Sequence, residues 1–297
     1  MDKPTLQTSS PITSRIWLVL ATLVLSGCSP LSSIPSNPPQ TPENWLKIQP
    51  SHLARLGAVE FILVQPSSTV FVYLLGILAV AAGVYILKIR EGQRTRLWWG
   101  IALILWGFGA LFAGTSYQAF SYEIKCRGRE ICSWTSGWEV LYLLFSVASV
   151  DAMMLAEAYV FAPGKWRKGL IGYALANIAL YAVTLVAGVL SLNKFLISFE
   201  FLLLVTAPSI VVLLALSIWR YAKFRDPMDL GLMITWIWLG LVIGAYFTAL
   251  QLGITEAFWE QGFWFSENDV LHIGLISWML YIAIRLAKRV HDSTASS

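Results

Sequence analysis

Charged residues are scarce in this sequence: they make up 13% of its 297 residues, whereas soluble domains carry about a quarter. Histidine and cysteine are also scarce, with three of each. The sequence contains no phosphate-binding glycine loop, no Cys-x-x-Cys pair, no nucleophile elbow and no internal repeat. These absences give no support to a P-loop nucleotide site, a Cys-x-x-Cys redox or zinc motif, or an elbow-type serine hydrolase, and they direct attention to the apolar residues.

Long apolar runs dominate what is present, because 57% of the residues are hydrophobic. Seven runs exceed the ~17 residues that a helix needs to cross a bilayer: 67–89, 97–119, 138–162, 169–191, 195–219, 230–253 and 268–287. They are continuous rather than alternating, which excludes a transmembrane β-barrel. We therefore predict an all-α bundle of seven transmembrane helices over residues 67–287, followed by a short tail, 288–297. In the sixth run, Gly240 and Gly244 have the GxxxG spacing that permits close helix packing.

Basic residues concentrate in alternate connections between the runs. The rich connections contain Lys88, Arg90, Arg94 and Arg96; Lys165, Arg167 and Lys168; Arg220, Lys223 and Arg225; and Arg285, Lys288 and Arg289. The connections between them are poorer, and 254–267 has no basic residue. By the positive-inside rule, the rich set is cytoplasmic, with the N-terminus outside and the C-terminus inside. The net charge of +4 is then a sign of topology, and we expect no nucleic-acid partner.

The N-terminal region has the order of features found in secretory signals. Arg15 precedes an apolar stretch, 16–25, that is too short to span a bilayer. It leads into Leu25-Ser-Gly-Cys28, which is similar to the bacterial lipoprotein signal. We expect a signal peptide over 1–27, lipidation of Cys28, and a location in the bacterial cytoplasmic membrane; an ordinary signal or an uncleaved anchor is the alternative.

The residues after this signal are rich in proline and serine. Such a composition cannot bury enough apolar surface to fold by itself. We expect residues 28–66 to form a flexible, extended extracytoplasmic tether that ends in a short amphipathic segment, 45–65.

The two remaining cysteines, Cys126 and Cys132, both fall in the connection between the second and third runs. Charge bias places this connection outside, where the bacterial environment is oxidising. Gly128 lies between them and suits a tight turn. A Cys126–Cys132 disulfide is therefore predicted, with two free thiols as the alternative.

Polar side chains gather in the outer halves of several runs. Asp151 lies near the middle of the third run, and ionisable groups there are costly and often functional. Toward the outer ends lie Ser116, Tyr117, Gln118, Glu200, Gln251, Asn268, Asp269 and His272. These residues predict an outward-facing polar pocket with Tyr117, Gln118, Glu200, Gln251 and Asn268 as ligand contacts. For Asp151, an interhelical hydrogen bond is an equal alternative.

The start of the seventh run permits two interpretations. Ser266 stands three residues before Asp269, which is the spacing of a helix capping box. His272 lies one turn further on, where Asp269 could instead order it as a metal ligand or a general base. Capping explains Asp269 completely but leaves His272 unexplained.

Some of these residues resemble a known superfamily, which unites alkaline ceramidases, progestin-and-adiponectin-type receptors and related membrane hydrolases. That superfamily binds zinc through a Ser-x3-His, an Asp and a His-x3-His on helices two, three and seven. Ser116 matches the serine, Asp151 the acid and His272 the last histidine; Phe120 and Asn268 replace the other two histidines. The phrases Gly114-Thr-Ser-Tyr117 and Asn268-Asp-Val-Leu-His272 also resemble those of uncharacterised bacterial seven-helix proteins.

The leading functional hypothesis is a non-catalytic or sensory membrane protein that binds a ligand and is surrounded by membrane lipids. One alternative is a lipid amide or ester hydrolase with Ser116, Asp151, Asp269 and His272 as catalytic candidates and zinc on His272. Another is a proton-coupled transporter that uses Asp151, Glu157 and Glu200. We expect no retinal, because the seventh run has no lysine for a Schiff base.

Overall fold

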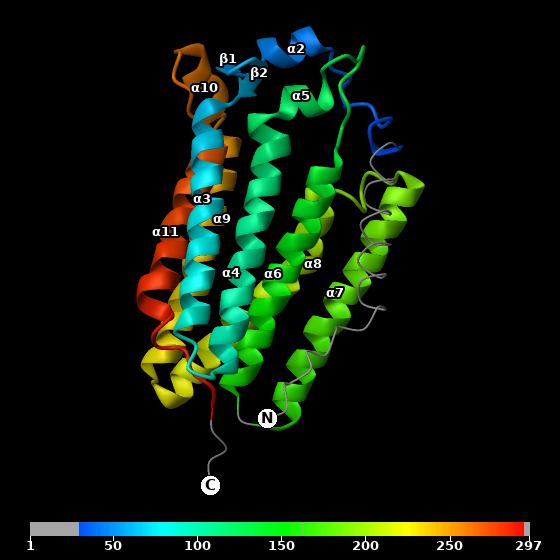
Figure 1. Ribbon diagram of the computed structural model, residues 1–297. Coiled ribbons are helices and arrows are strands. Elements are labelled where there is room, and N and C mark those ends of the chain that lie inside the picture. Colours follow the sequence, from blue (N-terminus) through cyan, green and yellow to red (C-terminus); the bar gives the residue numbers. More distant parts are fainter. Residues whose placement is uncertain (1–29, 162, 294–297) are drawn as a thin grey trace, which may run out of the picture.

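Seven long helices stand side by side in a bundle that carries a small cap at one end (Figure 1). The computed structural model describes residues 30–161 and 163–293; the predicted signal peptide and Cys28 lie outside the described residues. The long helices are α3 (Pro66–Lys88), α4 (Arg94–Ala113) extended by the π-helix η1 (Gly114–Ala119), α6 (Gly137–Val160), α7 (Lys165–Ser191), α8 (Phe199–Phe224), α9 (Pro227–Gln251) and α11 (Glu267–Tyr281), extended by the π-helix η2 (Ile282–Leu286).

All seven helices are long and apolar enough to cross a membrane. They match the seven predicted runs, so the prediction of an all-α seven-helix bundle is confirmed. The protein is a multi-pass membrane protein on this evidence. The predicted starts and ends differ from the helices by up to about five residues, because charged side chains such as Arg94 and Lys165 lie inside the first turns.

The cap consists of five short elements at the end of the bundle where α3 begins (Figure 1). They are α2 (Pro42–Lys47), β1 (Ser51–Leu56), β2 (Val59–Val64), α5 (Ser121–Lys125) and α10 (Ile254–Glu260). The strands β1 and β2 form an antiparallel hairpin in which Ser51 faces Val64. Segment 45–65, expected as one amphipathic stretch, thus consists mainly of the end of a helix and a hairpin.

The first described residues also differ from the expected flexible tether. Leu31 and Ile34 are buried against the cap ends of α6, α7 and α8, in a cluster with Leu143, Tyr181 and Leu202. The backbone of Ser36 donates to Cys132 O at 2.9 Å, and Trp134 N donates to Ile34 O at 2.8 Å. Proline-rich composition prevents a regular strand here, but the bundle supplies the apolar surface and the backbone partners that the segment lacks alone.

The long helices pack in a closed circuit. α3 lies between α4 and α11, α4 packs on α6, α6 on α7 and α8, α8 on α9, and α9 on α11. α6 is the most enclosed of the spans, with 61% of its most apolar window buried. The main apolar core therefore joins α3, α4, α6, α9 and α11, whereas α7 packs chiefly on α6 at one edge.

Paired glycines bring α3 and α4 into backbone contact. A Cβ added to Gly83 would lie 2.6 Å from Gly100 O, and one added to Gly107 would lie 2.7 Å from Gly76 O. The reverse distances, from Gly76 to Gly107 O and from Gly100 to Gly83 O, are both 3.0 Å. Each helix thus has two glycines seven residues apart, and each glycine faces the backbone of a glycine on the other helix. Small residues serve this purpose in membranes because close packing drives helix association there.

The GxxxG pair singled out in the sequence does not serve that purpose. No atom lies within 4 Å of a Cβ added at Gly240 or at Gly244. The glycine that brings α9 and α11 together is Gly274, where a Cβ would meet Val242 Cγ1 at 2.7 Å. The spacing of Gly240 and Gly244, which permits close packing, is therefore not used for a helix contact among the described residues, because spacing alone does not fix which face of a helix meets a neighbour.

Substituting Gly83 should destabilise the bundle. Gly83→Ala places a methyl group against the backbone of Gly100, and overpacking of this kind costs about 1–3 kcal/mol. The matched control is Gly240→Ala, where the new methyl group meets no atom within 4 Å. Thermal unfolding in detergent micelles should show a lower midpoint for Gly83→Ala and no loss for Gly240→Ala. Equal midpoints for the two variants would contradict the role of the glycine pairs.

Candidate functional site

A network of buried polar side chains closes the bundle beneath the cap. Ser116 on η1 donates to Glu139 Oε1 at 2.7 Å and lies 2.6 Å from Ser136 Oγ. Thr135 Oγ1 donates to Glu139 Oε2 at 3.0 Å. Glu139 stands in the first turn of α6, where the positive end of the helix dipole favours a carboxylate. Both carboxylate oxygens therefore have hydrogen-bond donors, although the group is buried.

Lys125 completes this network from the cap. Its ammonium group forms an ion pair with Glu139, and the two side chains are only 5% and 3% exposed. The same Nζ lies 4.8 Å from the centre of the Tyr117 ring, a distance suited to a cation–π contact. Ser116 thus serves as a structural donor. The sequence gives no signal for Lys125 or Glu139, because they lie at the border between a run and a loop.

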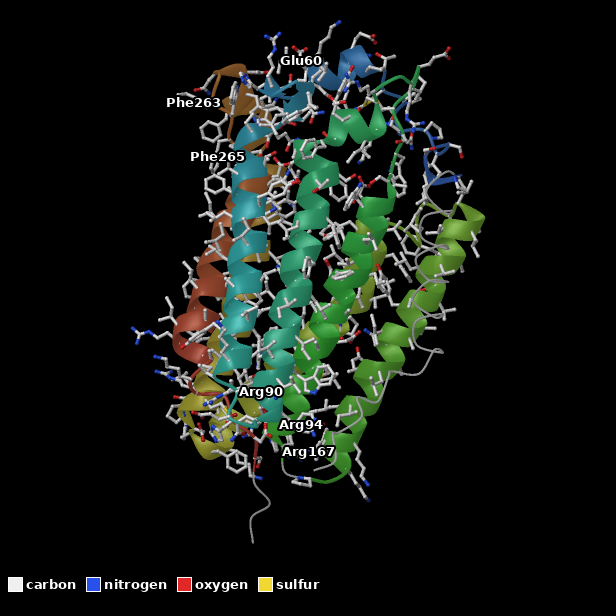
Figure 2. The ribbon with its side chains drawn as sticks, viewed as in Figure 1. Glu60, Arg90, Arg94, Arg167, Phe263 and Phe265 are labelled. Atoms are coloured by element: carbon white, nitrogen blue, oxygen red, sulfur yellow. A yellow bond between two sulfur atoms is a disulfide. The ribbon has the colours of Figure 1, made fainter. Side chains whose placement is uncertain are left out.

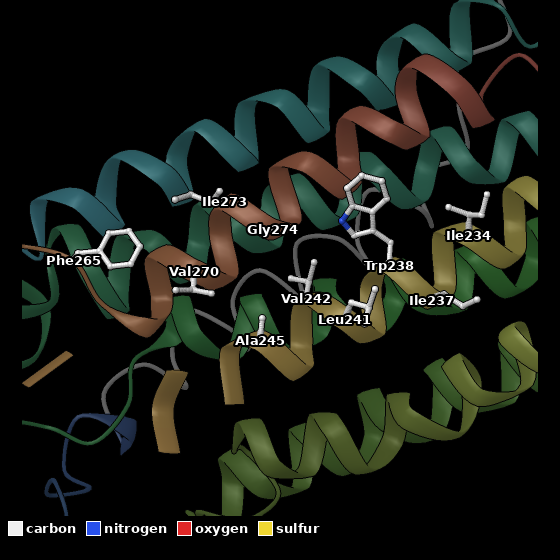
Figure 3. A pocket seen from close by; sticks show the side chains of 10 residues that line it. All are labelled: Ile234, Ile237, Trp238, Leu241, Val242, Ala245, Phe265, Val270, Ile273 and Gly274. Atoms are coloured by element: carbon white, nitrogen blue, oxygen red, sulfur yellow. The ribbon is translucent and has the colours of Figure 1, made fainter. Parts of the chain in front are cut away.

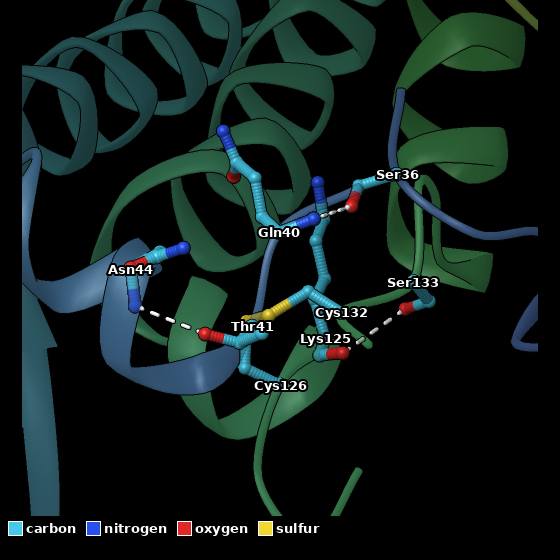
Figure 4. The surroundings of a disulfide bond; sticks show 8 residues. All are labelled: Ser36, Gln40, Thr41, Asn44, Lys125, Cys126, Cys132 and Ser133. Atoms are coloured by element: carbon cyan, nitrogen blue, oxygen red, sulfur yellow. Dashed lines mark hydrogen bonds between the residues drawn. A yellow bond between two sulfur atoms is a disulfide. The ribbon is translucent and has the colours of Figure 1, made fainter. Parts of the chain in front are cut away.

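The disulfide next to Lys125 confirms the predicted pair. Cys126 and Cys132 are bonded to each other, and both are fully buried. Figure 4 shows how the bridge lies beside Lys125, Gln40 and Ser36. Cys132 N donates to Gln40 O at 2.8 Å, so the disulfide loop holds the N-terminal segment as well as α5.

The remaining predicted ligand contacts differ in burial and in their partners. Tyr117 packs edge-to-face on Tyr142, with ring centres 6.0 Å apart. Gln118 is buried, and its Oε1 has no hydrogen-bond partner among the described residues. Glu200 and Gln251 are exposed and Asn268 is half-buried. Their role in binding stays a prediction.

Asp269 is the N3 residue of a capping box at the start of α11, whose N-cap residue is Ser266. Its Oδ2 accepts from Ser266 N at 2.7 Å, and the capping box predicted from Ser266 and Asp269 is present. Ser67 of α3 also donates to this oxygen at 3.1 Å, and Ser68 lies 3.0 Å from Ser266 Oγ. The first turns of α3 and α11 are therefore held together by hydroxyl groups.

His272 lies one turn after Asp269 in α11, but no hydrogen bond joins the two side chains. The histidine is buried at 7% exposure, and neither its Nδ1 nor Asp269 Oδ1 has a partner within the described ranges. The capping interpretation of Asp269 is confirmed, whereas the hydrogen bond that would order His272 is not formed. The metal and catalytic roles of His272 stay predictions.

Two further acids on α6 lie deeper in the bundle. Asp151 accepts from Asn177 Nδ2 of α7 at 3.0 and 3.1 Å, which is the interhelical hydrogen bond given above as an alternative. Glu157 is fully buried, and both of its carboxylate oxygens lack a hydrogen-bond partner among the described residues. Near the end of the bundle opposite the cap, Arg220 of α8 donates to Asp229 of α9 at 2.7 Å.

The predicted catalytic residues are thus divided among separate networks. Ser116 belongs to the network around Glu139, and Asp269 belongs to the capping box at the start of α11. Asp151 belongs to the contact between α6 and α7. Within residues 30–161 and 163–293, no three His, Cys, Asp or Glu side chains are grouped so as to hold a metal ion. In this part of the chain, His272 therefore does not belong to a set of three such ligands, which is the number that catalytic zinc usually has.

An apolar cavity lies elsewhere in the bundle. A groove of about 540 Å³ runs between α9 and α11, and Figure 3 shows side chains of both helices around it. Its lining consists of Ile234, Ile237, Trp238, Leu241, Val242, Ala245, Phe265, Val270, Ile273 and Gly274. The sequence could not reveal it, because apolar residues in a transmembrane run look alike whether they face lipid, a groove or the core.

Replacing one partner of the Lys125–Glu139 ion pair should destabilise the protein more than replacing both partners. Lys125→Met or Glu139→Gln alone leaves a buried group without its partner, and we expect a loss of about 3 kcal/mol in the free energy of unfolding. The double variant should lose much less than the sum of the two. The control is Arg55→Met, because the Arg55–Glu60 pair is exposed and such pairs contribute about 0–1 kcal/mol. Denaturant unfolding of all four variants measures this, and additive losses would contradict the coupling.

Comparison with known proteins identifies a family but no activity. A family described as "Family of unknown function (DUF6962)" matches residues 67–289. No curated protein and no solved structure matches the chain significantly, and no finding links it to the ceramidase and receptor superfamily. The match covers the whole bundle from α3 to the end of η2, which is more than half of the chain. The protein therefore belongs to this family of unknown function.

Proposed function

We propose that the protein is a non-catalytic membrane protein that binds a lipid-like molecule in the groove between α9 and α11. The observation that carries this proposal is the groove itself, whose volume of about 540 Å³ falls within the ~300–1,000 Å³ typical of ligand pockets. An apolar chain bound there fills space that the helices leave open and makes van der Waals contacts with the side chains that line it.

The composition of the lining selects the ligand. Nine of the ten lining residues are Ile, Leu, Val, Ala, Phe or Gly, whose side chains offer no hydrogen bond. Trp238 contributes the only polar side-chain group, its indole N–H, which is a donor. The lining therefore suits a long apolar chain that carries at most one acceptor at this depth, such as the carbonyl oxygen of a fatty acyl ester.

The position of the groove indicates how such a ligand enters. Leu241 is 68% exposed and Ile273 is 42% exposed, so the walls of the groove lie on the surface of the bundle that faces the membrane. A lipid-like molecule can therefore reach the groove sideways from the bilayer. A water-soluble ligand would have to cross the cap, where Phe263 and Phe265 stand near α10 (Figure 2).

The hydrolase and transporter alternatives rest on the sequence alone. Ser116, Asp151 and Asp269 accept or donate hydrogen bonds that hold helices and turns together. Among the described residues, the Nδ1 of His272 has no hydrogen bond that would join it to them. Ligand binding is favoured over both alternatives because it uses a cavity that the bundle contains.

We also propose an orientation, with the cap outside the bacterial cytoplasmic membrane and the lipidated Cys28 on the same side. Basic residues support it, since Arg90, Arg94 and Arg167 lie at the end opposite the cap (Figure 2). The disulfide supports it independently, because Cys126 and Cys132 belong to the cap side and disulfides form in oxidising compartments.

Cysteine labelling in whole cells tests this orientation. Glu260 lies on α10 in the cap, and Lys223 lies at the end of α8 that is opposite the cap; both residues are exposed. Each is replaced by cysteine in turn, as Glu260→Cys and Lys223→Cys. A membrane-impermeant maleimide should label position 260 and leave position 223 unlabelled until the cells are opened. Labelling of 223 but not 260 in intact cells would reverse the orientation.

Filling the groove should block lipid binding. Ala245 lines the groove, so Ala245→Phe places a ring where the ligand would lie. The matched control is Ala187→Phe, on an exposed face of α7. The probe is a fatty acid that carries a photoreactive diazirine in its chain. The native protein and the control should be cross-linked on α9 and α11, and Ala245→Phe should lose most of this product.

Peptide mapping of the cross-links provides the contrary outcome. If the probe reacts equally with Ala245→Phe and the native protein, or reacts mainly with α7, the groove is not the binding site. Unfolding midpoints of both variants, measured in the same detergent, confirm that each bundle is folded.

A further inference from the structure

A second groove lies on another side of α11, near the end of the bundle opposite the cap. It has a volume of about 370 Å³ and runs between α3 and α11. Leu78, Tyr85, Leu280 and Ala283 are among the side chains that line it, and Lys288 also takes part in the lining. Unlike the groove between α9 and α11, it therefore combines apolar walls with a positive charge.

The backbone at Lys288 is held in place by α4 and the connection before it. Arg96 donates through Nη2 to Lys288 O at 3.3 Å and through Nε to Val290 O at 3.0 Å. The Asp292 carboxylate accepts from Arg94 N at 2.8 Å and from Thr95 N at 2.7 Å, which caps the start of α4. The predicted cytoplasmic tail is thus fixed against the bundle over its described part, up to residue 293.

The ammonium group of Lys288 is available, in contrast to its backbone. The side chain is exposed, and it has no hydrogen bond, ion pair or ring contact in the part of the chain that the structure describes. Arg96 shows the opposite arrangement, since its guanidinium is committed to Ile89 O at 2.8 Å and to Glu91. The fold therefore fixes one cation at the groove and leaves its charge unneutralised.

This combination is complementary to one class of membrane component. The groove lies along two transmembrane helices, so an acyl chain can lie in it, and Lys288 follows the last turn of η2, where headgroups begin. A lysine near an anionic membrane surface is worth about 1 kcal/mol. A zwitterionic headgroup offers no net charge to such a cation, so the site should distinguish between the two kinds of lipid.

We propose that the groove between α3 and α11 binds an anionic phospholipid, with one acyl chain against Leu78, Leu280 and Ala283 and the phosphate on Lys288. The phenol of Tyr85, which also lines the groove, can donate to the glycerol ester region. This site is separate from the groove between α9 and α11. Its occupant is selected by charge, and it does not depend on the function proposed above.

Native mass spectrometry of the purified full chain, titrated with phosphatidylglycerol or phosphatidylcholine of the same acyl chains, tests the proposal. The native protein should bind phosphatidylglycerol more tightly. Lys288→Gln should lower that affinity about fivefold and abolish most of the preference, while Lys288→Arg should retain it. The matched control is Lys168→Gln, an exposed lysine near the start of α7 at the same end of the bundle, which should change nothing.

A second variant separates the chain from the charge. Ala283→Phe fills the groove and leaves Lys288 in place, so it should weaken both lipids and keep any remaining preference for the anionic one. Equal losses in Lys288→Gln and Lys168→Gln would show diffuse surface attraction and overturn the site. Displacement of phosphatidylglycerol by millimolar inorganic phosphate, together with full binding in Ala283→Phe, would show a simple anion site and also overturn the proposal.

Discussion

The lack of water in the bilayer core is the constraint on which the rest of this structure depends. A polar group within the membrane-spanning part of the protein needs a hydrogen-bond partner in the protein, because an unsatisfied group costs several kcal/mol there. The bundle meets this demand mainly with pairs between neighbouring elements, and Glu157 is an exception, because neither of its buried carboxylate oxygens has a hydrogen-bond partner among the described residues. Asn177 bonds Asp151, Arg220 bonds Asp229, and Lys125 lies on Glu139. These contacts occur where α6 meets α7, where α8 meets α9, and where α6 meets the cap.

This use of polar groups changes what the sequence implies about function. Ser116, Asp151 and Asp269 have the residue types and depths of a catalytic set, yet each one holds two parts of the chain together. The two grooves described above are mainly apolar. One groove between α9 and α11 offers a single indole donor, and another between α3 and α11 has a lysine beside it. A membrane protein built in this way is suited to recognise molecules that already reside in the bilayer.

The features that the sequence predicts well depend on strong local signals. The seven runs, the Cys126–Cys132 disulfide and the Ser266–Asp269 capping box each require only spacing and residue type, and each is present in the structure. The proposed sidedness likewise depends on a local signal, the number of Lys and Arg residues in each connection.

The features that it misses depend on which faces meet. Gly76, Gly83, Gly100 and Gly107 form the contact of α3 with α4, whereas the more familiar Gly240 and Gly244 face open space. Asn177 gives no sign in sequence that it bonds Asp151. The segment before α3 was expected to be a flexible tether because its prolines disfavour regular structure, but buried Leu31 and Ile34 and the backbone of the disulfide loop hold it on the bundle. Pairing of this kind is a property of the whole fold.

The central claim is that the groove between α9 and α11 holds a lipid-like chain. The most direct test is a single-particle density map of the full chain in lipid nanodiscs. The account predicts elongated, unbranched density that lies along the groove and contacts Trp238 and Val270. A groove closed by contact of Trp238 with Ile273, with no elongated density between α9 and α11, would contradict it.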